Sequence, residues 1–595
     1  MREVRPWLVC CLVLLPVVGA YANAPSVGFM WDDQLLIQQN VEVHELHAPW
    51  SYLTRVFWQH TFLYGGGHAF YRPLVNFSFA LDWQLWGGAA SGFHLTNLLL
   101  HLLVCVLVFS LARSRGANVW AAGVCTALFG VMPRLTESVT WVVGRTDVLA
   151  VLFALSAVLL STRKEWWRGP AVALLIFFGL LSKEVALVGL MVLLAEAALR
   201  VRAKERSLRD EAVAAAPLGI AVIAWLVLRS SVPSADPLRF HDPQTFFAGV
   251  GNYVWMVLTP WNAHAQLGLV LAPEPWAAVL GLVSSLGFAW GLWQLAQSKT
   301  PWRAVWVGGA AMGVAMVTLV ALTVYTMASD RFLYLPLALL AVVAAQAKWN
   351  RATLSVGALV VVALAVTTFL RNEVWANPLR FWRDVVANAD ARNPGAIAGL
   401  GDAYFDLNRL EEAKTQFERA ESTNRELIAN TFIRGWSGHS PWPLSIAVTD
   451  SRLGYDSAAL SRLEPLVRAE PRWRRAAYSL VLVRARAGDF TGAREQLNQA
   501  RSNFGDDEFL RDLDTRVADG EAGVRSGDAL TRARALHSLA ATRKAEAEYL
   551  RVENEEAWRW LVVYGTETDA RAAAAKLPGD EGVQAELNER FPPGE

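Results

Sequence analysis

Hydrophobic and polar positions divide this chain into two parts. Up to about residue 370, apolar runs alternate with short polar loops, and past Arg371 the pattern changes to helices rich in Ala, Arg, Glu and Leu. An apolar run of about 20 residues is long enough to cross a membrane as a helix. We expect eleven such helices, over residues 7–24, 93–112, 118–132, 146–161, 169–182, 184–199, 212–229, 276–297, 303–327, 331–347 and 352–370.

Composition supports an integral membrane protein. Of 595 residues, 54% are apolar and only 18% charged, which is too hydrophobic for an ordinary soluble multidomain protein. The net charge of +1 argues against a nucleic-acid partner, which requires a basic surface. All four cysteines lie in apolar runs, so no loop carries a pair for a disulfide or a zinc site. Arg outnumbers Lys, as in GC-rich bacterial genomes, and we expect a bacterial cytoplasmic membrane.

Basic residues predict the orientation. They cluster in alternate short loops, at Arg113, Arg163, Arg200, Lys299 and Lys348. Such loops face the cytoplasm, so the N-terminus is expected inside, and the loop 25–92 and everything after residue 371 outside. A cleaved signal peptide is the alternative for the first run, but many spans follow, which favours an uncleaved helix. The apolar run 246–259 is expected to be a re-entrant or interfacial helix on the outer side, since no basic cluster follows it.

The second part shows a 34-residue period typical of tetratricopeptide repeats. A unit beginning at Pro394 places its small and large apolar residues at the expected offsets, and units from Ser440 and Arg474 continue the phase. We expect a first domain over 1–370, a linker over 371–393, repeats over 394–507 and a C-terminal helical region over 508–595. Stacked repeats form a concave face that binds extended peptide, so an acceptor protein or peptide is an expected partner.

Acidic and basic residues gather in the outer loops. The stretch GFMWDDQLLIQQN, residues 28 to 40, places two adjacent carboxylates at the membrane surface, where charge is costly unless it is used. Each single charge could also be a solvated loop residue or an anchor at the membrane surface. Together, carboxylates and cations at the mouth of a helical bundle suit glycosyl transfer from a lipid phosphate, because a carboxylate can deprotonate an acceptor hydroxyl while cations stabilise the departing phosphate.

The order of these motifs resembles a known family. WDDQLLIQQN, YRPLVNFSFALDWQLWG, TESVTWVVGRTDVLA, LSKE and DRFLYLP, followed by the repeats, are similar to the transmembrane and tetratricopeptide-repeat O-mannosyltransferases over residues 28 to about 507. The resemblance implies an all-α, GT-C type multispan bundle with an α-solenoid. It also implies an inverting glycosyltransferase that uses a polyprenyl-phosphate-linked sugar, mannose in the eukaryotic members, with Ser or Thr hydroxyls of proteins as acceptors.

The same resemblance assigns expected roles. Asp32 is expected to be the general base and Asp33 its orienting neighbour. Further acidic or orienting residues would be Glu137, Asp147 and Glu184, and the donor phosphate would be bound first by Arg331, then by Lys183, Arg72 and Arg145. The family has His residues just before TE, where this chain has Met132, Arg134 and Leu135. A metal site is therefore not expected, and no cofactor beyond the lipid-linked donor is predicted.

Some features and functions remain as alternatives. His94, Asn97 and His101 are expected to be a polar stripe that packs against neighbouring helices rather than a metal site. A lipid-linked-sugar transferase acting on a cell-envelope lipid or glycan stays open, as does a non-enzymatic membrane anchor for a repeat scaffold. A transporter is disfavoured, because transport sites lie near the membrane midplane and these charges lie at loop edges on one side.

Overall fold

The structure is a computed structural model that describes residues 5–55, 57, 70–163, 165, 167–232, 243–263, 267–269, 275–320, 327–388, 393–429, 442–506 and 508–592. The chain forms two compact units, Met1–Asp390 and Ala391–Glu595. The expected all-α architecture is confirmed. The only sheet in the described residues is a short antiparallel ribbon, in which β1 (Leu267–Leu269) pairs with β2 (Met327–Ala328).

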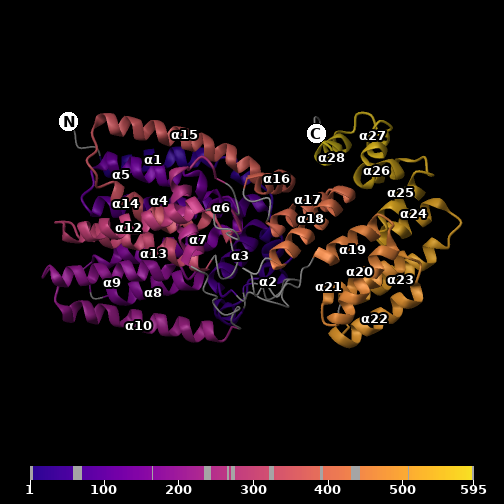
Figure 1. The fold of residues 1–595 in the computed structure, drawn as a ribbon, viewed down its shortest axis with the longest axis horizontal. Helices are drawn as coiled ribbons and strands as arrows, with labels where there is room; N and C mark the ends of the chain where they lie inside the picture. The colour runs from indigo at the N-terminus through magenta and orange to yellow at the C-terminus, as the bar shows by residue number, and fades with distance from the viewer. Residues whose placement is uncertain are drawn as a thin grey trace. The chain divides into compact units, whose positions relative to one another are not determined.

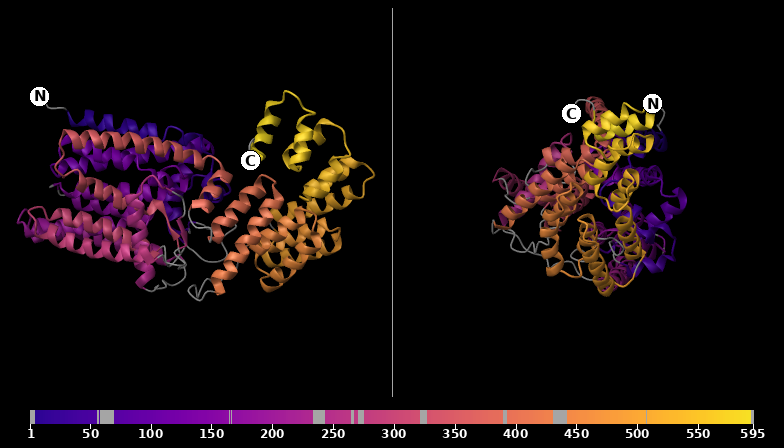
Figure 2. Two further views of the ribbon diagram at one scale, coloured as in Figure 1. Left: turned by 45° about the horizontal axis from the view of Figure 1, so that its top comes forward. Right: turned by 90° about the vertical axis from the view of Figure 1, so that its right-hand side faces the viewer.

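The long helices of the first unit lie side by side in a bundle (Figure 1), and a second direction of view shows the same arrangement (Figure 2). Each of the eleven apolar runs coincides with one of these helices; residues 321–326 of the run 303–327 lie outside the described residues. The helices are α1 (Pro6–Ala20), α4 (Ala90–Ser114), α5 (Val119–Gly130), α7 (Arg145–Ser161), α8 (Arg168–Ser182), α9 (Ala186–Arg202), α10 (Leu208–Ser230), α12 (Pro275–Gln297), α13 (Trp302–Val320), α14 (Tyr334–Ala344) and α15 (Arg351–Trp375).

Fewer than eleven of these helices are individually long and apolar enough to cross a membrane. Among the described residues six pass by length and composition, those built on α1, α4, α7, α10, α12 and α15. A seventh candidate joins α5 to the segment Pro133–Val139 across a bend of 51°. Helix α14, with 11 residues, spans about 16 Å, roughly half the hydrocarbon core. The apolar helices support a multi-pass membrane protein, and the count of eleven spans stays a prediction.

Burial distinguishes the centre of the bundle from its outside. Helix α7 is largely surrounded by other helices, whereas α10, α12 and α15 present rows of exposed apolar side chains, Ile220, Leu286 and Leu359 among them. An apolar face of that kind is what a helix turns toward lipid. The lipid-facing helices thus enclose a core built around α7.

Five further helices of the first unit lie outside these eleven: α2 (Val41–His44), α3 (Pro73–Trp86), α6 (Thr136–Val139), α11 (Pro243–Leu258) and α16 (Pro378–Asn388). The run 246–259 forms α11, which packs against α12 through Gly251 and Gly281. A Cβ on Gly251 would lie 1.9 Å from the carbonyl oxygen of Ala277, so only glycine permits this approach. Its re-entrant placement in a membrane stays a prediction.

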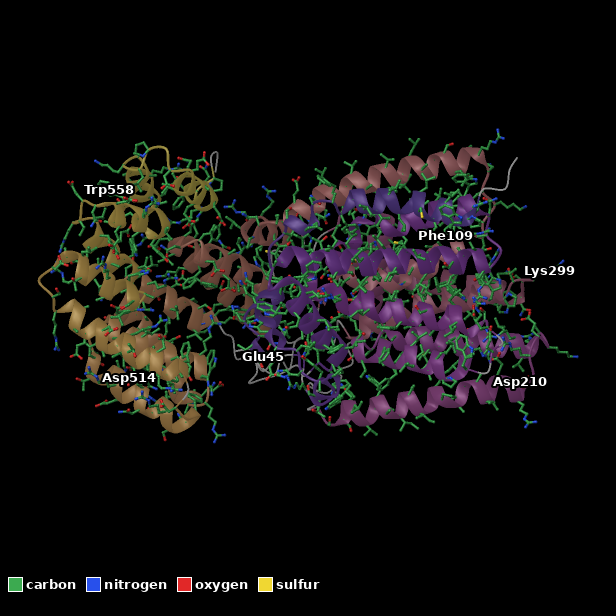
Figure 3. The ribbon with its side chains drawn as sticks, turned by 180° about the vertical axis from the view of Figure 1, so that it is seen from behind. Glu45, Phe109, Asp210, Lys299, Asp514 and Trp558 are labelled. Carbon is green, nitrogen blue, oxygen red and sulfur yellow. The ribbon has the colours of Figure 1, made fainter. Side chains whose placement is uncertain are left out.

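The two ends of the bundle carry different loops. Figure 3 shows Glu45, from the segment after α1, at one end, and Asp210, from the first turn of α10, and Lys299, from the loop between α12 and α13, at the other. The alternation expected from the basic residues therefore separates the basic loops from the loop that carries the acidic pair.

The segment expected to be a linker is mostly helical. Residues 371–388 form the last turn of α15 and the helix α16, and both belong to the first unit. Arg371 and Asp384 form an ion pair of 2.7 Å that fastens α16 to α15. The boundary between the two units falls after this helix.

The second unit is a series of helices in which the expected repeats appear as helix pairs. Gly401 on α17 faces the ring of Phe417 on α18 so closely that a Cβ would lie 2.7 Å from it, which explains a glycine at this repeat position. The helices are α17 (Pro394–Asp406), α18 (Leu410–Ala429), α19 (Trp442–Arg452), α20 (Asp456–Ala469), α21 (Arg474–Arg486), α22 (Phe490–Phe504), α23 (Glu508–Val524), α24 (Ala529–Ser538), α25 (Thr542–Tyr549), α26 (Glu555–Tyr564), α27 (Glu567–Ala574) and α28 (Glu581–Arg590).

Candidate active site

Asp33 is held in place by backbone amides. Its side chain is buried; Oδ2 accepts a hydrogen bond from the N–H of Met30 at 3.1 Å, and Oδ1 accepts one from the N–H of Val143 at 2.9 Å. Burial raises the pKa of Asp33 to about 8, against these backbone hydrogen bonds, which favour the ionised form. The contacts join the loop after α1 to the turn before α7, so Asp33 has a structural role in this end of the bundle.

Asp32 has different surroundings. It is half-buried, and within the described part of the chain no hydrogen bond or ion pair engages its carboxylate. Burial raises the pKa of Asp32 to about 7, while the positive charges of Arg331 and Arg72 act in the opposite direction. A carboxylate that titrates near neutral pH and is not held by the protein can accept a proton from a bound hydroxyl.

Arg331, whose positive charge acts on Asp32, is held in place by Glu137. The backbone N–H of Arg331 donates to Glu137 Oε2 at 3.0 Å and its guanidinium forms an ion pair with Oε1 of the same side chain. Ser329 Oγ donates to that oxygen at 2.5 Å. The guanidinium also lies 5.1 Å from the ring of Trp141 and 5.0 Å from that of Phe332. Glu137 thus orients a cation, and its role in a reaction stays a prediction.

Lys183 and Asp147 form a second ion pair in the same region. Lys183 Nζ lies 2.6 Å from both carboxylate oxygens of Asp147 and 4.8 Å from the ring of Phe332, which also contacts Arg331. Burial lowers the pKa of Lys183 to about 8; Asp147 opposes this shift, and the charges of Arg72 and Arg331 add to it. The ammonium group therefore lies within electrostatic reach of both guanidinium groups.

Arg72 completes the group of cations. It directly precedes α3, whose first residue is Pro73, a position where proline fits because its missing N–H has no partner in the first turn. The guanidinium lies 4.8 Å from the ring of Phe70 and 5.3 Å from that of Phe57, and its Nε is buried with no hydrogen-bond partner among the described residues. Such a donor is available to an anion.

Two other predicted site residues stand apart. Arg145 is fully buried, and its guanidinium donates to Asn97 Oδ1, to the carbonyl oxygens of Ser78 and Phe93, and to Asp82 in an ion pair. Because its donors are taken, we do not include Arg145 in the phosphate site. Glu184 follows Lys183 in the turn before α9; it is half-buried, and among the described residues its carboxylate has no hydrogen bond or ion pair.

Trp31, the residue before Asp32, belongs to an aromatic cluster whose members the sequence did not identify. Trp31 stacks on Trp141 with ring centroids 4.7 Å apart and meets Trp382 of α16 edge-on at 5.9 Å. Its backbone has φ of 52°, in the left-handed region that few non-glycine residues occupy. The WDD triplet, with Trp directly before the acids, was the available signal. These contacts hold the chain at the residue that precedes Asp32.

Arg134, which lies between Met132 and Leu135, is buried and joins two segments of the chain. It forms an ion pair of 2.7 Å with Asp330 and donates to the carbonyl oxygens of Met256, at 2.9 Å, and Thr259, at 2.8 Å. These carbonyl groups lie at the end of α11 and just beyond it. Arg134 therefore fixes the end of α11 next to the segment that carries Arg331.

The polar stripe on α4 is confirmed as a packing feature. Asn97 Nδ2 donates to the carbonyl oxygens of Val139, Trp141 and Val142 at 3.1–3.3 Å. His101 Nε2 donates to Gly130 O at 3.0 Å, and its Nδ1 accepts from the Tyr334 hydroxyl at 2.6 Å. These side chains donate hydrogen bonds to carbonyl groups at the end of α5, at the end of α6 and in the turn that follows α6.

The described residues therefore bring Asp32 together with Arg72, Lys183 and Arg331. In this arrangement a carboxylate can take a proton from a hydroxyl while the cations hold an anion nearby. Asp33, Glu137 and Asp147 act behind them, each tying one of these side chains or its segment in place.

The chain is similar in sequence to proteins that are named protein O-mannosyl-transferases. No protein-family model matches the chain. It is 30% identical over 310 residues to protein O-mannosyl-transferase Tmtc2 of Drosophila melanogaster, a match over 50% of this chain and 31% of that protein. It is 34% identical over 178 residues to protein O-mannosyl-transferase Tmtc1 of the same species, over 29% and 20% of the two chains. It is 31% identical over 159 residues to human protein O-mannosyl-transferase TMTC3, over 27% and 17%.

Less than a third of each of these relatives is matched. Within that extent, the resemblance inferred from the motifs is confirmed.

Proposed function

We propose that this chain, like the protein O-mannosyl-transferases it resembles, transfers a sugar to hydroxyl groups of proteins. The donor would be a polyprenyl-phosphate-linked mannose and the site would face the extracytoplasmic side of a bacterial cytoplasmic membrane. The observation that carries the proposal is the carboxylate of Asp32, which has no partner within the described residues and lies in the field of Arg331 and Arg72.

The reaction uses these groups in one displacement. The acceptor oxygen attacks the anomeric carbon and its proton passes to Asp32, because a neutral hydroxyl is a poor nucleophile. The bond between the anomeric carbon and the phosphate oxygen breaks, and its electron pair stays on the phosphate. Attack from the face opposite to the phosphate inverts the anomeric configuration.

The cations act on the leaving group. Arg331, oriented by Glu137, would form charge-assisted hydrogen bonds to the phosphate that strengthen as negative charge develops on it. Arg72 offers its unpartnered Nε, and Lys183 adds a nearby positive charge. No metal ion is invoked, since the cations supply the charge stabilisation.

The repeats would serve the acceptor. A helical repeat array suits binding of extended or folding protein segments, which agrees with relatives named for transfer to protein. The alternatives are a transferase that acts on an envelope lipid or glycan, with the repeats recruiting a partner, and a scaffold without enzymatic activity.

The test is mannosyl transfer by the purified full-length protein from a synthetic polyprenyl phosphate mannose. Wild-type protein is expected to label a protein acceptor on Ser or Thr, and Asp32→Asn is expected to lose this labelling while it folds normally. Labelling of a lipid or glycan alone would favour the envelope transferase. If labelling never exceeds that of Asp32→Asn with any acceptor, the scaffold reading is correct.

A further inference from the structure

A second set of cations lies at the other end of the bundle, in three loops that join α4 to α5, α12 to α13 and α14 to α15. Residues 112–118, 298–303 and 345–351 contain six basic residues and neither Asp nor Glu: Arg113, Arg115, Lys299, Arg303, Lys348 and Arg351. Figure 3 shows Lys299 at the end opposite to Glu45. The proposed reaction uses none of these residues.

Side-chain contacts draw the three loops together. Gln346 Nε2 donates to the carbonyl oxygen of Ala112 at 2.9 Å, and Arg303 donates to the carbonyl oxygen of Gln346 at 3.2 Å. The guanidinium groups of Arg115 and Arg303 lie 5.7 Å and 5.8 Å from the ring of Trp302. Arg113 directly follows Ala112, so Arg113, Arg115 and Arg303 lie on segments that contact one another, and we call this group of three arginines the basic crevice.

The charges of the basic crevice are only partly balanced. Arg115 donates to both oxygens of Glu196, a buried carboxylate from α9, at 2.6 Å. Arg113 donates to the carbonyl oxygen of Ala117 and Arg303 to that of Gln346; among the described residues, neither guanidinium pairs with a carboxylate. Glu196 also lies 3.7 Å from Arg200, so it is shared between two cations and leaves the charges of Arg113 and Arg303 unbalanced by a carboxylate among the described residues.

Unused hydrogen-bond donors mark the same place. The Nε atoms of Arg113, Arg115 and Arg303 are all buried and have no hydrogen-bond partner in the part of the chain that the structure describes. A buried donor left unpaired is unfavourable, and three of them around excess positive charge would be satisfied by an anion with several oxygen atoms.

We propose that the basic crevice binds the phosphate of an anionic phospholipid headgroup. Its three segments lie at the ends of membrane helices, and the half-buried Trp302 has an amphipathic ring of the kind that lies at headgroup depth. Basic pockets between membrane helices are known to hold anionic headgroups, with the acyl chains along the neighbouring apolar faces. The site is independent of the proposed transfer.

Thermal unfolding of the full-length protein in mild detergent, after removal of lipid, tests the proposal. Added phosphatidylglycerol is expected to raise the melting temperature in a saturable way, whereas phosphatidylcholine with the same acyl chains and inorganic phosphate are not. For Arg113→Gln with Arg303→Gln, the phosphatidylglycerol concentration at half-saturation should rise on the order of tenfold or more, since each basic residue near a lipid surface contributes to attraction of its headgroup.

A matched control separates the crevice from general surface charge. Lys348→Gln with Arg351→Gln removes the same charge from two exposed positions of these loops and should leave the phosphatidylglycerol response as in the wild type. Equal loss in both double variants would overturn the proposal, as would equal protection by phosphatidylcholine or by inorganic phosphate.

A measurement on the wild type guards against a variant that does not fold. Native mass spectrometry of the protein released from detergent should show phosphatidylglycerol retained in preference to phosphatidylcholine from an equimolar mixture. Retention of the two lipids in equal amounts would overturn the proposal without any variant.

Discussion

Asp33 accepts a hydrogen bond of 2.9 Å from the backbone N–H of Val143, although 110 residues separate the two along the chain. The carboxylate next to it in sequence, Asp32, has no such partner among the described residues. The two adjacent aspartates therefore differ in the hydrogen bonds that the protein makes to them. Asp33 is held by the fold, and Asp32 remains available to a substrate.

Asn substitutions of the two acids should therefore separate stability from activity. Asp33→Asn places an NH₂ group against one of two backbone N–H donors, so it should lower the free energy of unfolding by about 1–3 kcal/mol. Asp32→Asn should melt at the wild-type temperature and lose on the order of a hundredfold or more in turnover, the usual contribution of a general base. Thermal unfolding and transfer assays on both variants measure this. Normal stability with lost activity in Asp33→Asn alone would reverse the two roles.

The rate should depend on pH through Asp32. Burial raises the pKa of Asp32 to about 7, and a general base works only when ionised, so turnover should rise as pH increases through about 7. The same shift makes the contribution of Asp32 to the free energy of unfolding depend on pH. This contribution is greatest below about pH 4 and is lost as pH rises to about 7. Turnover measured from pH 5 to 9 at saturating donor tests the first effect. A flat profile would exclude Asp32 as the base.

Replacing Arg331 with Lys should reduce turnover even when the donor is saturating. Lysine keeps the charge near Glu137 but loses the planar fork and the stacking on Trp141. We expect a roughly tenfold lower kcat, because hydrogen bonds that strengthen in the transition state are lost. Steady-state kinetics with donor varied provide the measurement. Unchanged kcat with a raised KM would mean that Arg331 only binds the donor.

Truncation at two positions should separate the catalytic unit from the repeats. A chain that ends after Asn388 keeps α16 and its contact between Trp382 and Trp31, so it should still modify a small hydroxylated peptide but act poorly on a protein acceptor. A chain that ends after Arg371 lacks this contact and should fail with both acceptors. Full-length Trp382→Ala is the matched control, and we expect it to lower transfer to peptide and protein alike. Full peptide transfer by the shorter chain would show that α16 is dispensable.

Reporter fusions should locate the two ends of the bundle. Alkaline phosphatase, which is active only outside the cytoplasm, should be active when fused after Asp506 and inactive when fused after Lys299. A fluorescent reporter that requires the cytoplasm should give the opposite pattern. The reverse result would place the acidic loop inside and remove the basis for a lipid-linked donor on the outer side.

Much of the fold could be predicted because membrane helices leave a strong sequence signal. Every apolar run coincides with a helix, since lipid and buried core both require apolar side chains on backbone that satisfies its own hydrogen bonds. The segment 371–393, expected to be a linker, contains the helix α16, which the sequence did not predict because its polar residues resemble those of a soluble segment. The structural role of this helix follows from the contact between Trp382 and Trp31, which the sequence does not show.

Long-range pairings could not be read from the sequence. Arg145 and Arg331 both occupy loop motifs, and nothing local shows that the first is saturated by Asp82 and Asn97 while the second faces Asp32. The stacking of Trp31 on Trp141 is likewise a contact that the sequence does not show. Such contacts join segments far apart in the chain, and they depend on how the helices pack.

Arg134 and Asn97 together donate hydrogen bonds to five backbone carbonyl groups in the irregular segments around the site. In most proteins, exposed loops meet that need with solvent. Here side chains take the place of solvent at these five carbonyl groups. For the proposed reaction this has a kinetic meaning: water is itself a hydroxyl compound and competes with Ser and Thr for the activated sugar. A backbone that needs no hydration thus favours glycosylation over wasteful hydrolysis of the donor.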